Sequence, residues 1–294
     1  MREAIRVENI SHRFGKNIVL GNINIEFEQG KIHGLFGKNG SGKTTLLSII
    51  ANQLIPDSGR VKIEGSYVDE RIDELEKVCI VKENNNISSD TRVKDLIERY
   101  RSFFNLYDVE YERYLFDKFG FNNQRDMKKG FRTMSRGQKS IIMIVLALAS
   151  NAEITIFDEP TAGLDERNRK IFYDELIEKY SETGNTFIIT THLIGEIENL
   201  IEHAVIIDES KVVVDEDLSD IEEKGFTISG LKEDIEKLDF YEELKYINKI
   251  GSTENYFAYR NMDGNEFEEM KNLNISYEKA DLKTVFLNMT GGAE

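Results

Sequence analysis

Residues Gly37–Thr44 read GKNGSGKT, which fits the pattern G-x-x-x-x-G-K-[ST] of a phosphate-binding loop, or P-loop. The largely apolar run Ile32–Phe36 precedes the loop, and residues 44–52 (TTLLSIIAN) are typical of a helix. Glycines let the backbone wrap closely enough for several N–H groups to point at one anion, and the following helix N-terminus adds partial positive charge. The stretch therefore predicts a site for a nucleoside triphosphate rather than a chance glycine turn.

The side chains of this loop predict how a triphosphate is held. Lys43 can reach the β- and γ-phosphates, which makes it both a binding and a catalytic candidate, and the Thr44 hydroxyl can ligate a Mg²⁺ that bridges those phosphates. The loop residues that we expect to bind the nucleotide are Gly37, Lys38, Asn39, Gly40, Ser41, Gly42, Lys43, Thr44 and Thr45.

Composition limits the classes of partner and compartment. The chain has 294 residues and carries 38 Lys and Arg against 54 Asp and Glu, a net charge of −16. Such acidity argues against nucleic acid or an anionic lipid surface as the main partner. A single cysteine, Cys79, excludes an intrachain disulfide, and the longest apolar run, Ile141–Ala149, is too short to span a bilayer. We expect a cytoplasmic chain that does not itself cross a membrane.

Apolar periodicity predicts an α/β fold. Segments with strand character alternate with segments of helical spacing, which indicates a mostly parallel sheet covered by helices. The expected strands are 5–10, 18–27, 32–36, 60–64, 78–82, 154–157, 186–190, 204–207 and 212–214, and the expected helices are 44–52, 93–107, 111–121 and 166–180. Composition shifts near Asp215. Short strands at 225–231, 256–260 and 275–280 and a closing helix at 282–289 then indicate a small α+β appendage over residues 218–294.

A second constellation, Asp158–Glu159, follows the apolar strand ITIF. A carboxylate at a strand end near a P-loop is where a further Mg²⁺ partner sits, which we assign to Asp158. Glu159 can polarise an attacking water or take its proton, so we predict it to be the general base. The alternative is a solvated acidic turn before Pro160.

A third motif, Met134–Lys139 (MSRGQK), stands before an apolar helix. Ser135 is placed as a helix N-cap, and Gly137 allows the backbone to approach an anion. In isolation the segment indicates only a helix cap. A functional interpretation depends on the order of the motifs around it.

The order of P-loop, SRGQ, ITIFDEP, AGLD and THL resembles that of the nucleotide-binding subunit of an ABC transporter, over about residues 2–216. The resemblance implies an ABC ATPase cassette at residues 1–217, with an antiparallel β part and a helical subdomain at about 84–150, and a separate domain at 218–294. It also implies ATP and Mg²⁺ as cofactors. Two such subunits form a head-to-tail dimer in which each site uses one chain's P-loop and the other chain's Ser135–Gln138 segment.

Further residue roles follow from the resemblance alone. Phe14 would stack on the adenine, and Asp165 would lie in the loop that crosses to the partner site. His192 would contact the γ-phosphate and orient Glu159 and the water. Ser135, Gly137 and Gln138 would bind the nucleotide held by the partner. His12, His33 and His203 match no such position, so we expect them to be structural.

Two positions depart from the family pattern. The usual LSGGQ is here Met134–Gln138, with Arg136 at the first glycine position, where its side chain either clashes or adds a cation near the phosphates. The family's glutamine after the strand 78–82 corresponds here to Glu83. We predict Glu83 as a third metal-approaching residue beside Thr44 and Asp158.

The last residues, LKTVFLNMTGG, resemble the tail domain of cassettes in bacterial peptide, antibiotic and lantibiotic export systems. In those systems the membrane-spanning permease is a separate chain. We therefore predict an ATPase, peripheral on the inner face of the cell membrane, that drives export of peptides or other amphipathic compounds as a homodimer or heterodimer.

Two alternatives belong to other classes. A soluble ABC ATPase acting on ribosomes or DNA usually has two cassettes or a coiled-coil insertion, and this acidic chain has neither. A nucleotide-binding regulator without turnover would not need Lys43, Asp158, Glu159 and His192 together.

The permease is expected to dock on Glu83–Asp90 and the helix at 93–107. This helix carries more aromatic side chains than one buried stripe requires, with Phe103 lying off the stripe beside Phe104 and Tyr107. A groove for a partner helix and simple packing within the subdomain both explain the surplus.

Overall fold

The computed structural model describes residues 3–68, 76–82, 87–88, 91–121 and 127–291. A six-stranded sheet forms the centre, in the order β10-β9-β3-β8-β7-β6, and all neighbours are parallel except β10 and β9. Its strands are β3 (Ile32–Gly37), β6 (Val78–Lys82), β7 (Ile154–Asp158), β8 (Thr186–Thr190), β9 (His203–Asp208) and β10 (Lys211–Asp217). Every residue of β3, β7 and β8 is buried, as in a parallel sheet covered on both faces.

Side-chain alternation along the central strands divides the core between two faces. Ile156 of β7 packs toward α1 (Lys43–Ile50) and the N-terminal antiparallel sheet. The next residue, Phe157, points to the opposite face, where its ring lies 5.1 Å from Phe172 of α6 (Glu166–Thr183). The predicted α/β architecture is confirmed.

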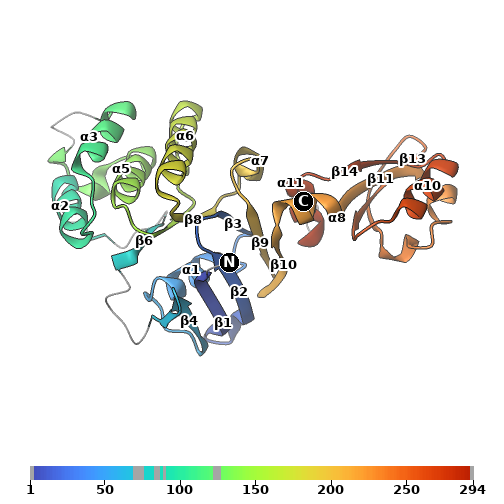
Figure 1. Cartoon of the computed structure of the whole chain (residues 1–294), viewed down its shortest axis with the longest axis horizontal. Coiled ribbons are helices and arrows are strands. Elements are labelled where there is room, and N and C mark those ends of the chain that lie inside the picture. The colour runs from blue at the N-terminus through green and yellow to red at the C-terminus, as the bar shows by residue number, and fades with distance from the viewer. Residues whose placement is uncertain (1–2, 69–75, 83–86, 89–90, 122–126, 292–294) are drawn as a thin grey trace.

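The remaining elements before residue 194 flank this sheet (Figure 1). The N-terminal antiparallel sheet has the order β2-β1-β4-β5, with β1 (Glu3–Phe14), β2 (Asn17–Glu28), β4 (Ser58–Ile63) and β5 (Ser66–Tyr67). On the other side lie α2 (Val93–Phe103), α3 (Val109–Lys118), the 3-10 turn η2 (Phe131–Thr133) and α5 (Arg136–Ala149).

The expected helix at 93–107 is too long. The structure ends α2 at Phe103, because Phe104 adopts an extended backbone and turns its side chain into the core. Asp108 then caps the next helix by accepting hydrogen bonds from the backbone N–H groups of Glu110 and Tyr111. This cap moves the start of α3 to Val109, two residues before the expected one.

The C-terminal part forms a third, antiparallel sheet in the order β12-β13-β11-β14. Its elements are β11 (Gly225–Leu231), α9 (Lys232–Ile235), the 3-10 turn η3 (Tyr241–Glu243), β12 (Lys245–Ile250), β13 (Thr253–Tyr259), α10 (Gly264–Asn272) and β14 (Ser276–Lys279). The βαββαβ sequence and strand order are those of a ferredoxin-like unit. The sequence prediction missed β12, none of whose residues is buried and whose alternation is broken by a register shift between Tyr246 and Asn248.

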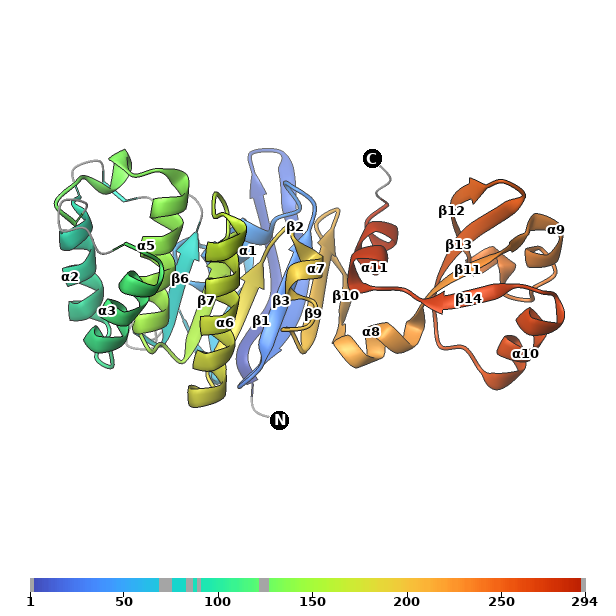
Figure 2. The same ribbon diagram turned by 90° about the horizontal axis from the view of Figure 1, so that it is seen from above.

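Three further helices lie near the junction with this third sheet (Figure 2). They are α7 (Ile194–Ile197), α8 (Leu218–Lys224) and α11 (Leu282–Met289), and α11 packs against both of the others. Helices α8 and α11 stand between β10 and the sheet, and α7 lies beside β9. Within the described part of the chain, no helix combines the length and apolarity needed to cross a bilayer.

A buried histidine pair lies inside the cassette, as expected for structural residues. His33 of β3 is fully buried, with its ring 5.2 Å from those of Phe27 and His203. Its Nε2 lies 2.9 Å from the Glu28 carbonyl oxygen. Burial lowers the pKa of His33 to about 4 from an ordinary 6.5, and this effect exceeds the opposing one of the Glu28 hydrogen bond.

We predict that His33 makes the folded chain sensitive to mild acid. Below pH 6.5 the unfolded chain binds a proton at this ring that the folded chain rejects until pH 4. The free energy of unfolding should therefore lose about 3 kcal/mol from this residue between those values. Urea unfolding of wild type and His33→Gln across this range isolates the contribution, because the variant does not titrate there. Equal pH slopes for both proteins would refute the prediction.

Candidate nucleotide-binding site

The P-loop joins β3 to α1 through backbone conformations that favour glycine. Gly40 and Gly42 have φ angles of 82° and 103°, and Gly42 is the N-cap of α1. A Cβ at Gly37 would lie 2.4 Å from the Ser41 hydroxyl oxygen, so a side chain there would force the loop apart. The loop conformation thus depends on the glycines of the motif.

Two side chains beneath the loop fit an anion. Lys43 Nζ donates to the carbonyl oxygens of Gly37 and Lys38, at 2.6 and 3.1 Å. Burial lowers the pKa of Lys43, while the nearby Glu159 and Asp158 carboxylates act in the opposite direction. The buried Ser41 hydroxyl has no hydrogen-bond partner among the described residues. A phosphate would give Ser41 an acceptor and Lys43 a counter-charge, so the loop fits a triphosphate.

Asp158 ends β7 opposite the P-loop helix. The Thr44 hydroxyl donates to Asp158 Oδ2 at 2.8 Å, and the Thr190 hydroxyl donates to Oδ1 at 2.7 Å. A hydroxyl and a carboxylate in contact are oxygen ligands that suit Mg²⁺. The third predicted metal residue, Glu83, lies outside the described residues.

Glu159 is held in an unusual conformation. Its φ of 54° lies in the left-handed region, which is rare for a residue of this type. Its backbone N–H donates to Thr190 Oγ1 at 3.0 Å, which fixes the backbone, and its Oε1 lies 3.1 Å from His192 Nε2. Burial raises the pKa of Glu159, against the lowering effects of His192 and Lys43. A raised pKa makes the carboxylate a stronger base.

These residues surround one cavity of about 400 Å³. Its lining consists of Phe14, Asn17, Val19, Asn39, Gly40, Gly42, Lys43, Thr44, Thr45, Asp158, Glu159 and His192. Phe14 is 56% exposed at the rim, with its ring 4.8 Å from that of His12. Gly37, Lys38 and Ser41 do not line the cavity.

Sequence reasoning missed Asn17, Val19 and Thr190. The first two face the cavity because a tight turn pairs Phe14 with Asn17 across the first hairpin. Thr190 stands two residues before His192, and its position in the TTH run was the available signal.

The other predicted residues lie outside this cavity. Ser135 and Gln138 form a capping box, with Ser135 Oγ accepting from the Gln138 N–H and Gln138 Oε1 accepting from the Ser135 N–H. Asp165 caps α6 through the Asn168 N–H. Gly137 packs so closely on Gly163 that a Cβ would lie 2.5 Å from the Gly163 carbonyl oxygen. The predicted N-cap role of Ser135 is confirmed.

Arg136, the departure from the family pattern, packs against Gly163 within this chain. It is the first residue of α5, and the stem of its side chain covers Gly163. A Cβ at Gly163 would lie 2.9 Å from Arg136 Cγ, so the glycine accommodates the larger residue.

Comparison with known proteins identifies the family. The family model described as ABC transporter matches residues 20–162. The ABC transporter ATP-binding protein MJ1023 of Methanocaldococcus jannaschii is 30% identical over 216 residues, which cover 72% of this chain and 77% of that protein. The chain belongs to the ATP-binding subunits of ABC transporters. It is therefore an ATP-hydrolysing P-loop ATPase.

A solved structure supports the same fold. The ATP-binding subunit of an ABC transporter superposes with a TM-score of 0.65 at 23% identity, covering 74% of this chain and 91% of that one.

The names of other relatives differ in what is transported. The lantibiotic transport ATP-binding protein SrtF of Streptococcus pyogenes is 26% identical over 72% of this subunit and 90% of its own length. The galactose/methyl galactoside import ATP-binding protein MglA of Treponema denticola is 29% identical, over 71% of this subunit and 44% of its own length. Family membership alone therefore does not identify the cargo.

We predict that two substitutions separate nucleotide binding from hydrolysis. Lys43→Ala removes the cation beneath the loop and should abolish tight ATP binding. Glu159→Gln keeps the size of the side chain but removes the base, so ATP should still bind while turnover falls by about 10²–10⁴-fold. Calorimetric ATP binding and phosphate release measure the two effects, with the exposed Glu182→Gln as control. Turnover in Glu159→Gln within a few-fold of wild type would show that the base lies elsewhere.

Proposed function

We propose that this ABC ATPase drives export of peptides or other amphipathic compounds through a separate membrane-spanning permease. The ATPase activity belongs to the family, and the export direction is the step beyond it. Its main support is the likeness to SrtF, a lantibiotic transport protein of which this chain covers 90%. The chain's own terminal sequence, which resembles the tails of such export cassettes, supports the same class.

We infer two functional parts in the chain. Residues 1–217 form the cassette, whose helical subdomain at about 84–150 contains α2, α3 and α5. Residues 218–294 form the small α+β domain, built on the third sheet. Helix α11 belongs to this second part by sequence but packs on α7 of the first.

The site residues take distinct roles in this proposal. The P-loop and Lys43 bind the phosphates, Phe14 stacks on the adenine, and Thr44 with Asp158 hold Mg²⁺. When bound, Mg²⁺ neutralises charge on the phosphates. Glu159 accepts the proton of the attacking water. His192 keeps the Glu159 carboxylate oriented through the contact at 3.1 Å.

Ser135, Gly137, Gln138 and Asp165 serve the nucleotide of a second subunit. None of them lines this chain's own cavity. The structural capping by Ser135 and Asp165 explains their positions within one chain, and it leaves the exposed Ser135 side chain accessible to a partner.

We predict that ATP closes two subunits into a dimer. Light scattering on Glu159→Gln should show a doubling of mass with ATP and Mg²⁺, because the variant binds without hydrolysis. When Ser135→Arg is added to Glu159→Gln, the protein should remain monomeric under the same conditions. The arginine places bulk and charge at the surface that the two subunits would share. A Glu159→Gln protein that stays monomeric at saturating ATP would contradict homodimeric closure and favour a heterodimer with another cassette.

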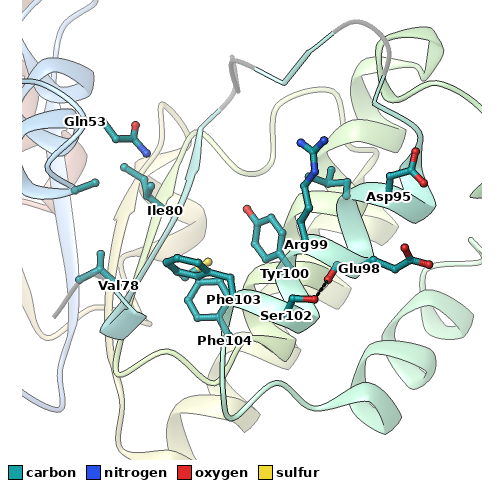
Figure 3. Close-up of a pocket in the computed structure, with 13 residues that line it drawn as sticks. Gln53, Val78, Ile80, Asp95, Glu98, Arg99, Tyr100, Ser102, Phe103 and Phe104 are labelled. Atoms are coloured by element: carbon teal, nitrogen blue, oxygen red, sulfur yellow. Dashed lines mark hydrogen bonds between the residues drawn. The ribbon is translucent and has the colours of Figure 1, made fainter. Parts of the chain in front are cut away.

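The docking surface that we propose for the permease is a cavity between α2 and the central sheet. Its volume is about 870 Å³, and its walls come mainly from α2, β6 and the residues just after α1. Figure 3 shows Phe103 and Tyr100 of α2 facing Val78 and Ile80 of β6. Phe103 is 50% exposed, so it does not merely fill the subdomain core. A half-exposed aromatic in an apolar groove is suited to anchor a short partner helix.

The other members of the expected docking surface behave differently. Tyr107 is packed against the core, and its hydroxyl donates to Glu112 Oε2 at 2.8 Å. Tyr107 follows the end of α2 and does not line this cavity, so the groove that we propose does not include it. Of the segment Glu83–Asp90, only residues 87–88 are among those described.

We predict that Phe103→Asp detaches the subunit from its permease. A charge in the groove costs binding energy, while basal ATPase and thermal stability should stay near wild type because half of the side chain is already exposed. The measurement is co-purification of the tagged subunit from native membranes, followed by mass spectrometry of what it retains. Leu106→Asp is the matched control, since Leu106 is 72% exposed and does not line this cavity.

The captured complex also tests the export function. In inside-out vesicles, wild type should drive ATP-dependent uptake of a labelled cationic amphipathic peptide and ignore labelled galactose. Uptake of neither, or uptake of the sugar alone, would overturn the export proposal. In the co-purification experiment, loss of the permease from both Phe103→Asp and Leu106→Asp, or from neither, would place the docking site on another surface.

A further inference from the structure

Helix α7 lies at a junction of contacts around His192. It begins two residues after His192, and its Ile194 and Ile197 are buried in the main core. On one side, Arg169 of α6 places its Nε 3.1 Å from both carboxylate oxygens of Glu196. The same guanidinium donates from Nη1 to the Leu164 carbonyl oxygen, next to Asp165. Movement of α7 would therefore reach both His192 and the loop that carries Asp165.

The C-terminal domain contacts α7 from the other side. Glu198, the residue that ends α7, accepts a hydrogen bond from the Leu282 backbone N–H at 2.6 Å. Leu282 and Val285 of α11 are buried in the same core cluster as Ile194 and Ile197. Only the short stretch after β14 separates α11 from the ferredoxin-like sheet (Figure 2).

The Glu198 contact is not needed to begin α11. Asp281 already caps this helix by accepting the Thr284 N–H at 2.7 Å. The Glu198 carboxylate instead spans 84 positions of sequence and attaches the start of α11 to the end of α7. Its distinctive effect is to tie two domains together at the element next to His192.

We propose that α7 relays the position of the C-terminal domain to His192, with Glu198 as a positioning residue for ATP hydrolysis. The proposal rests on the role of His192 in the proposed function. When α11 holds α7, His192 stays aligned with Glu159. When the C-terminal sheet shifts, α11 pulls on α7 and turnover slows. The ferredoxin-like domain thereby acts as a control element for hydrolysis rather than as a passive tail.

The test compares Glu198→Ala with a control that disturbs the C-terminal domain elsewhere. Asp263→Ala is that control, because Asp263 caps α10 through the N–H groups of Asn265 and Glu266, and its hydrogen bonds among the described residues all lie within this cap. Glu198→Ala loses one hydrogen bond to a backbone N–H and Asp263→Ala loses two, so the control disturbs the C-terminal domain at least as much. With full-length protein and Mg-ATP, kcat should fall about fivefold in Glu198→Ala, with KM and ATP affinity unchanged, whereas Asp263→Ala should keep wild-type kcat.

Two further variants sharpen the outcome. Glu198→Gln retains an oxygen acceptor for the Leu282 N–H, so it should restore most of the lost kcat. In a His192→Ala background, Glu198→Ala should cause no additional loss, because the relay has nothing left to position. Equal kcat values for Glu198→Ala and Asp263→Ala, or fully additive losses with His192→Ala, would overturn the relay.

The proposed function fails in a different way. If His192→Ala alone keeps wild-type turnover, the assignment of His192 is wrong, and the relay falls with it. If His192→Ala loses turnover while Glu198→Ala does not, His192 stands and only the relay is refuted.

Discussion

The Asp158 carboxylate connects the three elements on which the site depends. One oxygen accepts the hydroxyl of Thr44 on α1, and the other accepts that of Thr190 on β8, while Asp158 itself ends β7. Thr190 also holds the backbone of Glu159 in its left-handed conformation. Two threonines thus align the P-loop helix, Asp158 and Glu159. Because Asp158 is buried, this alignment is stabilised by hydrogen bonds in a low-dielectric setting, where each is stronger than at the surface.

Short motifs predicted most of this arrangement, since their function requires particular residues at particular spacing. Lys43, the pair Asp158–Glu159 and His192 are far apart in sequence, yet all lie at or soon after the carboxyl ends of parallel strands. The carboxyl ends of such strands meet at one sheet edge, so the order of motifs implies the cavity. Helix ends were less predictable. The spacing of apolar residues from 93 to 107 continues past Phe103, and only the cap by Asp108 and the packing of Phe104 decide where α2 stops and α3 starts.

The C-terminal unit was predicted as α+β but not as ferredoxin-like. The strand that the sequence prediction missed, β12, has no buried residue and pairs with β13 alone. Hydrophobic alternation therefore gives no signal for it. The position of α11 in the fold was equally difficult to predict from the sequence. Its apolar stripe at Leu282, Val285, Phe286 and Met289 indicates that it is covered, but the stripe does not say by which part of the chain. Only the tertiary structure shows that α7 supplies part of the covering surface.

Motif residues that cap helices also constrain how this ATPase can change shape. Ser135 and Asp165 start α5 and α6, so a shift of either helix carries its motif with it. Helix α6 is further joined to α3 through the fully buried Glu175, which accepts hydrogen bonds from the hydroxyls of Tyr111 and Tyr114 and pairs with Lys118. Separating the buried Glu175 carboxylate from these partners would cost free energy. We therefore expect α3 and α6 to move together. Motion at the groove that we propose for the permease on α2 would then reach the nucleotide site through the helical subdomain, while in the proposed relay motion of the C-terminal sheet arrives through α7.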